Sequence, residues 1–360
     1  MKGKSTWLVV TVLVATSAAH ASPPAIQWER TFGPSYDTAI HWVRQTRDGG
    51  FVIAGSVIPN PTSPWIVDMY LLKTDPLGNT QWQRRFNSGA NHDECMSVEQ
   101  TTDDGFVLVG NGGDSGGSVV VKTDSLGDSL WSYRGTANKV AFEIRQTSDG
   151  GYITGGLDYA HDSLYLLKLS STGNVLWTRE WYTGGYRNWD ARIPLATTQD
   201  HGYIVGAEVL TKLDSLGNVQ WSHRYPDNLY VIFSVKQTTD GGYVATGAGP
   251  PPNGRNIFNM VLIKTNSLGN LTWSRVLSSD ESATGRCVVQ TADGGYTVAG
   301  RVGLPDDCWH ARLVRTTSNG DTLWTKTLEP LTGAESCQET SDGGFIMSGD
   351  MEVWKLGNGQ

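Results

Sequence analysis

Short apolar runs alternate with polar turns along almost the whole chain, and no stretch has the 3.6-residue periodicity of an amphipathic helix. Apolar, β-rich runs at residues 231–235 and 243–246, for example, enclose the turn sequence Asp240-Gly241-Gly242. Because glycine tolerates the positive φ of a tight turn, this pattern predicts a two-stranded hairpin. The first prediction is therefore an all-β chain built from short hairpins.

This hairpin pattern recurs seven times with constant internal spacing. The aromatic residue after the turn lies six residues beyond a Gln-type position, as in Gln237 and Tyr243. In six copies a Trp lies nine residues beyond a basic residue, as in Lys264 and Trp273. The hairpin motif occupies residues 45–55, 100–110, 146–156, 197–206, 237–247, 290–300 and 339–349. Self-similarity at a period of this length indicates a repeat architecture.

Each repeat has room for four short antiparallel strands, A to D, which predicts one blade per repeat and a seven-bladed β-propeller. The last repeat ends before any Trp strand, whereas residues 26–32 contain a Trp strand with no hairpin before it. We therefore expect residues 26–32 to complete the last blade and close the ring, which removes an exposed sheet edge. The predicted D strands carry Trp28, Trp82, Trp131, Trp177, Trp221, Trp273 and Trp324.

Residues 1–21 have the features of an export signal. Lys2 and Lys4 precede an apolar run at residues 7–18, and Ala19-His20-Ala21 forms a cleavage site before residue 22. The apolar run is too short to span a bilayer. We therefore predict a signal peptide at residues 1–21 and a single propeller domain at residues 22–360. The mature protein is expected to be secreted, outside the cell, at its surface or in the periplasm, without a membrane span.

Composition is typical of a packed, turn-rich β chain, with 14 Trp, 43 Gly and 18% charged residues among 360. Loss of the two signal lysines leaves 26 basic against 36 acidic residues, a net charge of −10. Nucleic acid is therefore not expected as a partner.

Four cysteines, Cys95, Cys287, Cys308 and Cys337, lie in a chain predicted to enter an oxidising compartment. Their spacing fits no Cys-x-x-Cys metal site. Two alternatives stay open, one disulfide among the last three cysteines or buried free thiols. Cys337 falls in an apolar strand register, which favours a buried thiol at that position.

Each repeat joins a hairpin motif, such as Gln237 to Tyr243 in one copy, to a later turn and Trp, such as Asp214 to Asn218 and Trp221 in another copy. This repeat resembles exported bacterial and archaeal repeat propellers of the quinoprotein alcohol dehydrogenase-like superfamily. The resemblance covers nearly the whole mature chain and implies the propeller fold and export. It also implies that the strand from Gly217 to Trp221 docks neighbouring blades. The quinone site does not carry over, because the chain has no vicinal cysteine pair and no residue that matches the calcium ligands, so no cofactor is expected.

Loop lengths distinguish two faces of the predicted disc. The A–B and C–D turns keep a constant length, whereas the B–C and D–A connections vary, and each pair shares one end of every blade. We call these ends the constant face and the variable face. Binding residues tend to lie on variable loops held by a rigid scaffold. Candidate ligand-binding residues of the variable face are Trp65, His92, Asp93, Tyr159, His161, Tyr186, Trp189, Asp190, Trp309 and His310.

Flat aromatic side chains beside carboxylates suit sugar rings. The alternative is that Trp65, Trp189 and Trp309 fold back over the loops as packing residues. The Asp that recurs once in each hairpin is interpreted as a turn residue, and the repeated Trp as packing between blades.

Catalysis and metal binding remain alternatives without assigned residues. Acid pairs such as Asp93 with Glu94, Asp280 with Glu281 and Asp306 with Asp307 could supply the two carboxylates that glycoside hydrolysis needs, although solvated loop acids are the simpler account. His92, His161 and His310 could meet near the axis as metal ligands. Ordinary loop hydrogen bonds explain these histidines as well, so no metal is expected.

Charged residues share one register on the inner strands, just before the Gln position. Either they form a network near the central channel, or they are solvated packing residues. The set comprises Arg44, Glu99, Arg145 and Lys236.

The sequence therefore predicts an exported binding or interaction module, with a glycan or another cell-surface polymer as its partner. A glycoside hydrolase that uses loop carboxylates is the rival from another class. A structural cell-surface protein without a small-molecule ligand is the third alternative. A deep pocket with two converging acids would favour the hydrolase, and an aromatic platform would favour binding.

Overall fold

A computed structural model describes most of the chain beyond residue 21. The described residues are 22–33, 38–60, 62–63, 65–89, 91–113, 117–182, 192–250, 258–278, 282–303, 309–329, 333–349 and 352–357. The predicted signal at residues 1–21 lies outside this part, so export stays a prediction.

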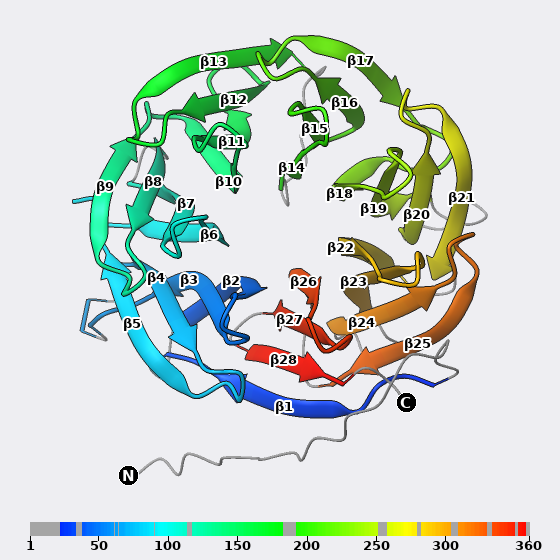
Figure 1. The fold of residues 1–360 in the computed structure, drawn as a ribbon, viewed down its shortest axis with the longest axis horizontal. Coiled ribbons are helices and arrows are strands. Elements are labelled where there is room, and N and C mark those ends of the chain that lie inside the picture. Colours follow the sequence, from blue (N-terminus) through cyan, green and yellow to red (C-terminus); the bar gives the residue numbers. More distant parts are fainter. Residues whose placement is uncertain are drawn as a thin grey trace.

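The described residues form a ring of seven four-stranded antiparallel sheets and contain no helix (Figure 1). Each sheet is one blade, with strand A at the central channel and strand D at the rim. The predicted all-β, seven-bladed propeller is confirmed. Within the described ranges, no helix is long and apolar enough to cross a membrane.

The strands follow one another around the ring in chain order. Blades 1 to 3 consist of β2 (Thr38–Gln45), β3 (Phe51–Val57), β4 (Asp68–Thr74) and β5 (Thr80–Phe86); β6 (Asp93–Gln100), β7 (Phe106–Gly112), β8 (Gly117–Thr123) and β9 (Ser129–Arg134); and β10 (Lys139–Gln146), β11 (Tyr152–Asp158), β12 (Ser163–Leu169) and β13 (Val175–Tyr182). Blades 4 and 5 consist of β14 (Leu195–Thr197), β15 (Tyr203–Gly206), β16 (Val209–Leu213) and β17 (Val219–Arg224); and β18 (Val231–Gln237), β19 (Tyr243–Gly249), β20 (Asn259–Thr265) and β21 (Leu271–Ser278).

Blade 6 consists of β22 (Ala283–Gln290), β23 (Tyr296–Gly303), β24 (Trp309–Thr316) and β25 (Thr322–Leu328), and blade 7 of β26 (Ser336–Glu339), β27 (Phe345–Gly349), β28 (Glu352–Leu356) and β1 (Ile26–Thr31). The N-terminal β1 pairs antiparallel with β28 and forms the outer strand of blade 7. The closure predicted from the split repeat is therefore confirmed.

Aromatic side chains join neighbouring blades through the core. At six of the seven blade junctions, the Trp of the D strand packs against the aromatic residue that follows the hairpin turn in the next blade. Ring centroids lie 5.4–6.0 Å apart in the pairs Trp28–Phe51, Trp82–Phe106, Trp131–Tyr152, Trp177–Tyr203, Trp221–Tyr243 and Trp273–Tyr296. This confirms the interpretation of the repeated Trp as packing residues. A Cβ on Gly127 would lie 2.6 Å from the Trp82 ring, which explains the glycine in the C–D turn.

Each A–B hairpin of the constant face is held by one ion pair between its Asp and a buried basic side chain. In blade 5, Asp240 accepts hydrogen bonds from the Thr238 hydroxyl and the Gly242 N–H and pairs with Lys264, whose side chain is only 7% exposed. The same pair forms in the other blades, at 2.7–3.0 Å for Asp48–Lys73, Asp103–Lys122, Asp149–Lys168, Asp200–Lys212 and Asp342–Lys355, and with Arg315 for Asp293. The turn role of the repeated Asp is confirmed. The repeated Asp pairs with the basic residue, which in the sequence only marked the repeat.

The Gln position of the repeat links the hairpins into a ring. The side-chain oxygen of Gln100, for instance, accepts from the Arg47 N–H of the preceding blade at 2.9 Å. Equivalent bonds of 2.7–3.1 Å run from Thr102 to Gln146, Gln199 to Gln237, Thr239 to Gln290, Ala292 to Glu339 and Ser341 to Gln45. At the remaining junction, where Thr197 replaces Gln, the Ser148 hydroxyl meets His201 Nδ1 at 2.8 Å.

Blades 6 and 7 are also covalently joined. Cys287 on β22 and Cys337 on β26 form a disulfide. Of the two alternatives from the sequence, a disulfide among the last three cysteines is therefore the correct one for this pair. Cys337 is buried as its apolar register predicted, but it is not a free thiol. Cys95 is a buried free thiol, and Cys308 lies outside the described residues.

Candidate functional site at the variable face

Several predicted binding residues of the variable face are exposed aromatics. Trp65, between β3 and β4, is 68% exposed, and Tyr159, between β11 and β12, is 60% exposed. Trp309 at the start of β24 is 39% exposed, with the Arg301 guanidinium 5.0 Å from its ring centroid. For Trp65 and Trp309, exposure of this size argues against the alternative of complete packing under loops.

Three other predicted residues are engaged within the fold. His92 Nε2 lies 2.9 Å from the Glu94 carboxylate. Asp93 has no exposed surface, and its carboxylate accepts hydrogen bonds from the Ser88 N–H and hydroxyl at 2.7 and 2.6 Å. His310 is buried, with 9% of its surface exposed.

The remaining predicted residues fall between β13 and β14 in the sequence. Tyr186, Trp189 and Asp190 lie outside the described residues, so their proposed role stays a prediction. The same holds for the candidate acids at residues 280–281 and 306–307.

The variable end of blade 3 brings the largest set of polar groups together. One row of paired residues crosses all four strands there, with Lys139 opposite Asp158, Asp158 opposite Ser163, and Ser163 opposite Tyr182. Directly paired residues project from the same side of a sheet. The row therefore places side chains from β10, β11, β12 and β13 in one cluster.

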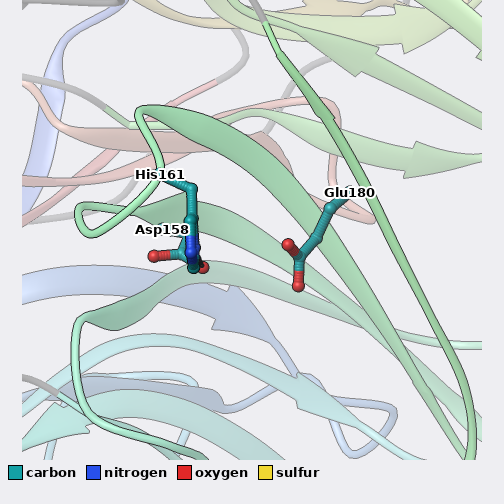
Figure 2. Close-up of side chains that lie close together, drawn as sticks. All are labelled: Asp158, His161 and Glu180. Carbon is teal, nitrogen blue, oxygen red and sulfur yellow. Dashed lines mark hydrogen bonds and ion pairs between the residues drawn. The ribbon is translucent and has the colours of Figure 1, made fainter.

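Asp158 is the centre of this cluster. Its side chain is 1% exposed and accepts hydrogen bonds from His161 Nδ1 and the Ala160 N–H, both at 2.9 Å. Lys139 Nζ lies 3.5 Å from the Asp158 carboxylate and also pairs with Glu180 of β13. Figure 2 shows the Asp158 and His161 side chains together, with Glu180 to one side of both.

The charges of the cluster are mutually compensated. Burial alone would raise the pKa of Asp158, but the hydrogen bonds from His161 and Ala160 and the charge of Lys139 outweigh it and lower that pKa. The hydrogen bond to Asp158 raises the pKa of His161. Burial would lower the pKa of Lys139, yet its pairing with Glu180 and Asp158 raises it. We call Lys139, Asp158, His161 and Glu180 the blade-3 cluster.

A metal ion would compete with a lysine in this cluster. Asp158, His161 and Glu180 offer one ligand atom each, all within 4.8 Å of one another, and they are the one such group in the described ranges. His92, His161 and His310 do not form such a group together. Lys139 already contacts both carboxylates, so it supplies the positive charge that an ion would bring.

The same contacts bear on acid–base catalysis. A glycoside hydrolase of either stereochemical type needs one carboxylic acid whose pKa is raised, so that it stays protonated and can donate to the leaving group. Asp158 has a lowered pKa and is 1% exposed. The blade-3 cluster therefore lacks the environment of a general acid at its buried carboxylate.

Exposed tyrosines flank the cluster. Tyr159 directly follows Asp158, and its N–H donates to the Asn138 carbonyl at 2.9 Å, which joins the B–C and D–A connections of blade 3. Tyr182, at the end of the paired row, is 70% exposed. Two exposed aromatic side chains thus adjoin the cluster, Tyr159 by its position in the chain and Tyr182 by the strand register.

The sequence predicted Tyr159 and His161 for this site but missed Lys139, Asp158 and Glu180. One signal was available, because the sixth residue after the hairpin aromatic is an acid in repeat 3 alone, where the other repeats have Val, Gly or Met. Lys139 and Glu180 lie on other strands of the blade. Only the strand register brings them to Asp158.

Comparisons with known proteins bear on the fold alone. No protein-family model and no curated protein sequence matches the chain. Among solved structures, a protein of unknown function from Bacteroides caccae is 14% identical, with a TM-score of 0.48 over 73% of this chain and 90% of the other. Sqt1 from Chaetomium thermophilum is 10% identical, with a TM-score of 0.54 over 88% of this chain and 80% of the other. The chain is thus similar to Sqt1 in fold.

Proposed function

We propose that this protein is an exported binding module that recognises a glycan, such as a cell-surface polysaccharide, at its variable face. The observation that carries the proposal is the blade-3 cluster together with the adjoining exposed residues Tyr159 and Tyr182. Aromatic rings offer apolar area to the C–H surface of a sugar ring. Carboxylates, an ammonium and an imidazole offer partners for its hydroxyl groups.

The distribution of polar groups supports this choice of face. On the constant face, the repeated Asp, basic and Gln side chains are paired within and between blades. On the variable face, Trp65, Tyr182 and Tyr230 expose 68%, 70% and 43% of their surfaces. Exposed aromatics beside ordered polar groups are features of recognition surfaces.

Export is part of the proposal and rests on the signal-like residues 1–21 together with the Cys287–Cys337 disulfide. Structural disulfides persist mainly in oxidising compartments. Membership in the exported repeat propellers of the quinoprotein alcohol dehydrogenase-like superfamily is proposed on the repeat motif and on the seven-bladed fold.

A glycan-array screen of the mature protein tests the function. We expect binding to at least one class of polysaccharide, and a loss of at least tenfold in the double variant Tyr159→Ala/Tyr182→Ala. Leu216→Ala is the matched control, because Leu216 is 62% exposed but lies in a C–D turn of the constant face.

Two results would overturn the proposal. Absence of binding to every glycan would favour the structural alternative. Full binding by the double variant would show that the glycan site lies elsewhere on the protein. Release of reducing sugar from a bound polysaccharide would instead identify the hydrolase alternative.

A further inference from the structure

The central channel holds charged side chains that the proposed glycan site does not use. Toward the constant face it opens into a cavity of about 370 Å³, lined by Arg44, Gln45, Arg47, Glu99, Gln100, Arg145, Lys236, Val289, Cys337 and Gln338. Toward the variable face it narrows to an enclosed space of about 20 Å³, the size of about one water molecule. Arg44 and Lys236 line both spaces, so the two spaces adjoin at these side chains.

The register predicted from the sequence does form a network here. Arg145 lies 3.7 Å from Glu99 and also pairs with Glu143, whose other oxygen accepts the Leu195 N–H at 2.8 Å. Lys236 reaches Glu143 at 3.6 Å. Of the two alternatives for the charged set, the network near the channel is the correct one.

Cations outnumber carboxylates in this network. Three cations, Arg44, Arg145 and Lys236, face the two carboxylates Glu99 and Glu143. Arg47 and Arg192 are left out because they pair with Asp104 and Glu335, respectively. These inner-strand residues thus carry a local surplus of one positive charge in a chain whose net charge is −8. A surplus of one sign in a narrow cavity concentrates ions of the opposite sign.

Arg44 has unused donors at the junction of the two spaces. One of its terminal nitrogens donates to the Val43 carbonyl, the Ser336 hydroxyl and the Cys337 carbonyl at 3.0–3.2 Å. Within the described residues it forms no ion pair, and its remaining N–H groups have no protein acceptor. An arginine fork binds carboxylate, phosphate and sulfate groups through two parallel hydrogen bonds.

A buried indole N–H provides an independent observation. Trp42 lines the enclosed space and is 9% exposed, and its Nε1 atom has no hydrogen-bond partner in the described part of the chain. The Arg44 and Arg145 guanidinium groups lie 4.4 and 5.4 Å from its ring centroid. A buried donor without an acceptor costs free energy, which an acceptor in the channel would recover.

Burial and neighbouring positive charges lower the pKa values of two channel cations. Burial lowers the pKa of Lys236 well below its ordinary value, and the nearby charges of Arg145 and Arg44 lower it further. Burial and the charge of Arg145 also lower the pKa of Arg44. Arginine stays protonated in proteins, so the repulsion is relieved by a counter-ion or by loss of the lysine proton.

We propose that the channel binds one small oxyanion, carrying a carboxylate, phosphate or sulfate group, between Arg44 and Lys236 and within reach of the Trp42 N–H. This site is separate from the blade-3 cluster, because its residues come from the inner strands β2 and β18 and its wider cavity opens at the constant face. The proposal therefore does not depend on glycan binding.

Thermal melting of the mature protein in bis-tris propane chloride tests the site. Sodium acetate, phosphate and sulfate are compared with sodium chloride at matched ionic strength, which separates an oxyanion site from general screening. We expect a rise in Tm of roughly 2–5 °C with at least one oxyanion at about 100 times its Kd. Calorimetric titration of that oxyanion should give a stoichiometry of one.

Variants assign the response to the named side chains. Lys236→Met should melt at or above the wild-type temperature in chloride, since it removes a repelled charge, and it should bind the oxyanion at least tenfold more weakly. Trp42→Phe should bind about fivefold more weakly, because it removes one neutral donor. Lys236→Arg should retain binding. Arg224→Gln is the control, which removes one positive charge from a side chain that is 54% exposed.

Three results would overturn the proposal. The first is a wild-type protein that melts at one temperature in all four salts. The second is an oxyanion response that Lys236→Met retains in full. The third is a Lys236→Met variant that melts several degrees lower in chloride, which would show that the fold itself compensates the ammonium charge.

Discussion

The two faces of the disc use similar residue types for different purposes. On the constant face, an Asp, a basic residue and a Gln-type residue recur in nearly every blade, and each finds its partner at a fixed place. At the variable end of blade 3, Asp158, Lys139 and Glu180 form ion pairs as well, but this set occurs once in the described part of the chain. Repetition therefore distinguishes polar groups that build the ring from polar groups available for binding.

The hairpin glycines of the constant face are also required by the ring structure. The second Gly of the hairpin turn is needed in every copy, because a Cβ on Gly242 would lie 2.2 Å from the Thr265 carbonyl and 2.5 Å from Lys264 Nζ. The first Gly is needed only for its positive φ. In two blades it is replaced by Asp104 and His201, both with a φ of 63°, and these residue types tolerate that conformation better than most.

Deleting residues 26–32 should have the largest effect, since it breaks the ring that both faces share. Blade 7 would lose its outer strand, and the edge of β28 would be exposed. Loss of the buried Trp28 and Phe32 costs ~1.5–3 kcal/mol each, so the free energy of unfolding should fall by several kcal/mol. Chemical denaturation measures this change. An unchanged unfolding midpoint would show that β1 does not close the ring.

Replacing both Cys287 and Cys337 by Ser should cause the second-largest loss of stability. The disulfide closes a loop with a sequence separation of 50 residues, and the chain-entropy model gives about 4 kcal/mol for a loop of that length. The glycan affinity of the folded fraction should be unchanged, because neither cysteine contacts the blade-3 cluster. A melting temperature equal to that of wild type under oxidising conditions would contradict the prediction.

Asp240→Ala tests the constant face alone. It leaves the buried Lys264 ammonium without its carboxylate and should lower the free energy of unfolding by roughly 2 kcal/mol, less than a fully buried pair because Asp240 is 63% exposed. Thr239→Ala is the control, since its backbone N–H keeps the bond to Gln290. Binding by the surviving folded protein should be normal, and a loss of glycan affinity would mean that the constant face takes part in recognition.

Tyr182→Ala tests the variable face in the opposite sense. The ring is 70% exposed, so the melting temperature should change little. Glycan affinity, measured by calorimetric titration, should fall by about 1–3 kcal/mol, the range of residues that matter at an interface. If the variant melts early and binds normally, Tyr182 is a packing residue and the comparison of the two faces fails.

The remaining predictions concern pH and separate two histidines. Burial, followed by the charge of Arg192, lowers the pKa of His41 to about 4. The unfolded chain then binds more protons between pH 4 and 6.5, so stability is full above pH 6.5 and falls through that window by up to about 1.4 kcal/mol per pH unit. Denaturation across pH should lose this slope in His41→Gln.

His161 should behave in the opposite way. Its pKa is raised, so its contribution is present below pH 6.5 and is lost as the pH rises through the folded-state pKa. His161→Gln should therefore leave the acid slope of His41 in place. Loss of that slope in His161→Gln would contradict the assignment.

Sequence spacing predicted the strands, the number of blades and the closure because these depend on local periodicity and on matched ends. The Trp strand at residues 26–32 matches the strand that the incomplete last repeat lacks, and the pairing of β1 with β28 confirms the match. The pairing of Cys287 with Cys337 could not be chosen, since it depends on how two neighbouring blades approach. The blade-3 cluster was only half predicted for the same reason, because Lys139 and Glu180 reach Asp158 through the register of four strands.

Asp93 is the opposite case, a predicted binding residue that is buried in the structure. In the sequence it is a loop acid beside Glu94 and His92, which suits a binding role. In the structure its carboxylate is satisfied by Ser88 and is fully covered. Asp93 begins strand β6, and its burial depends on the path of the adjoining loop, which residue types and spacing do not encode.

Amide hydrogen exchange of the mature protein, with and without a glycan found by array, tests the division between the two faces most directly. The account predicts new protection in the segments that hold the blade-3 cluster, at residues 138–140, 158–163 and 180–182, and unchanged exchange in the hairpin turns near Asp48 and Asp240. Protection confined to those turns, with none in blade 3, would contradict it.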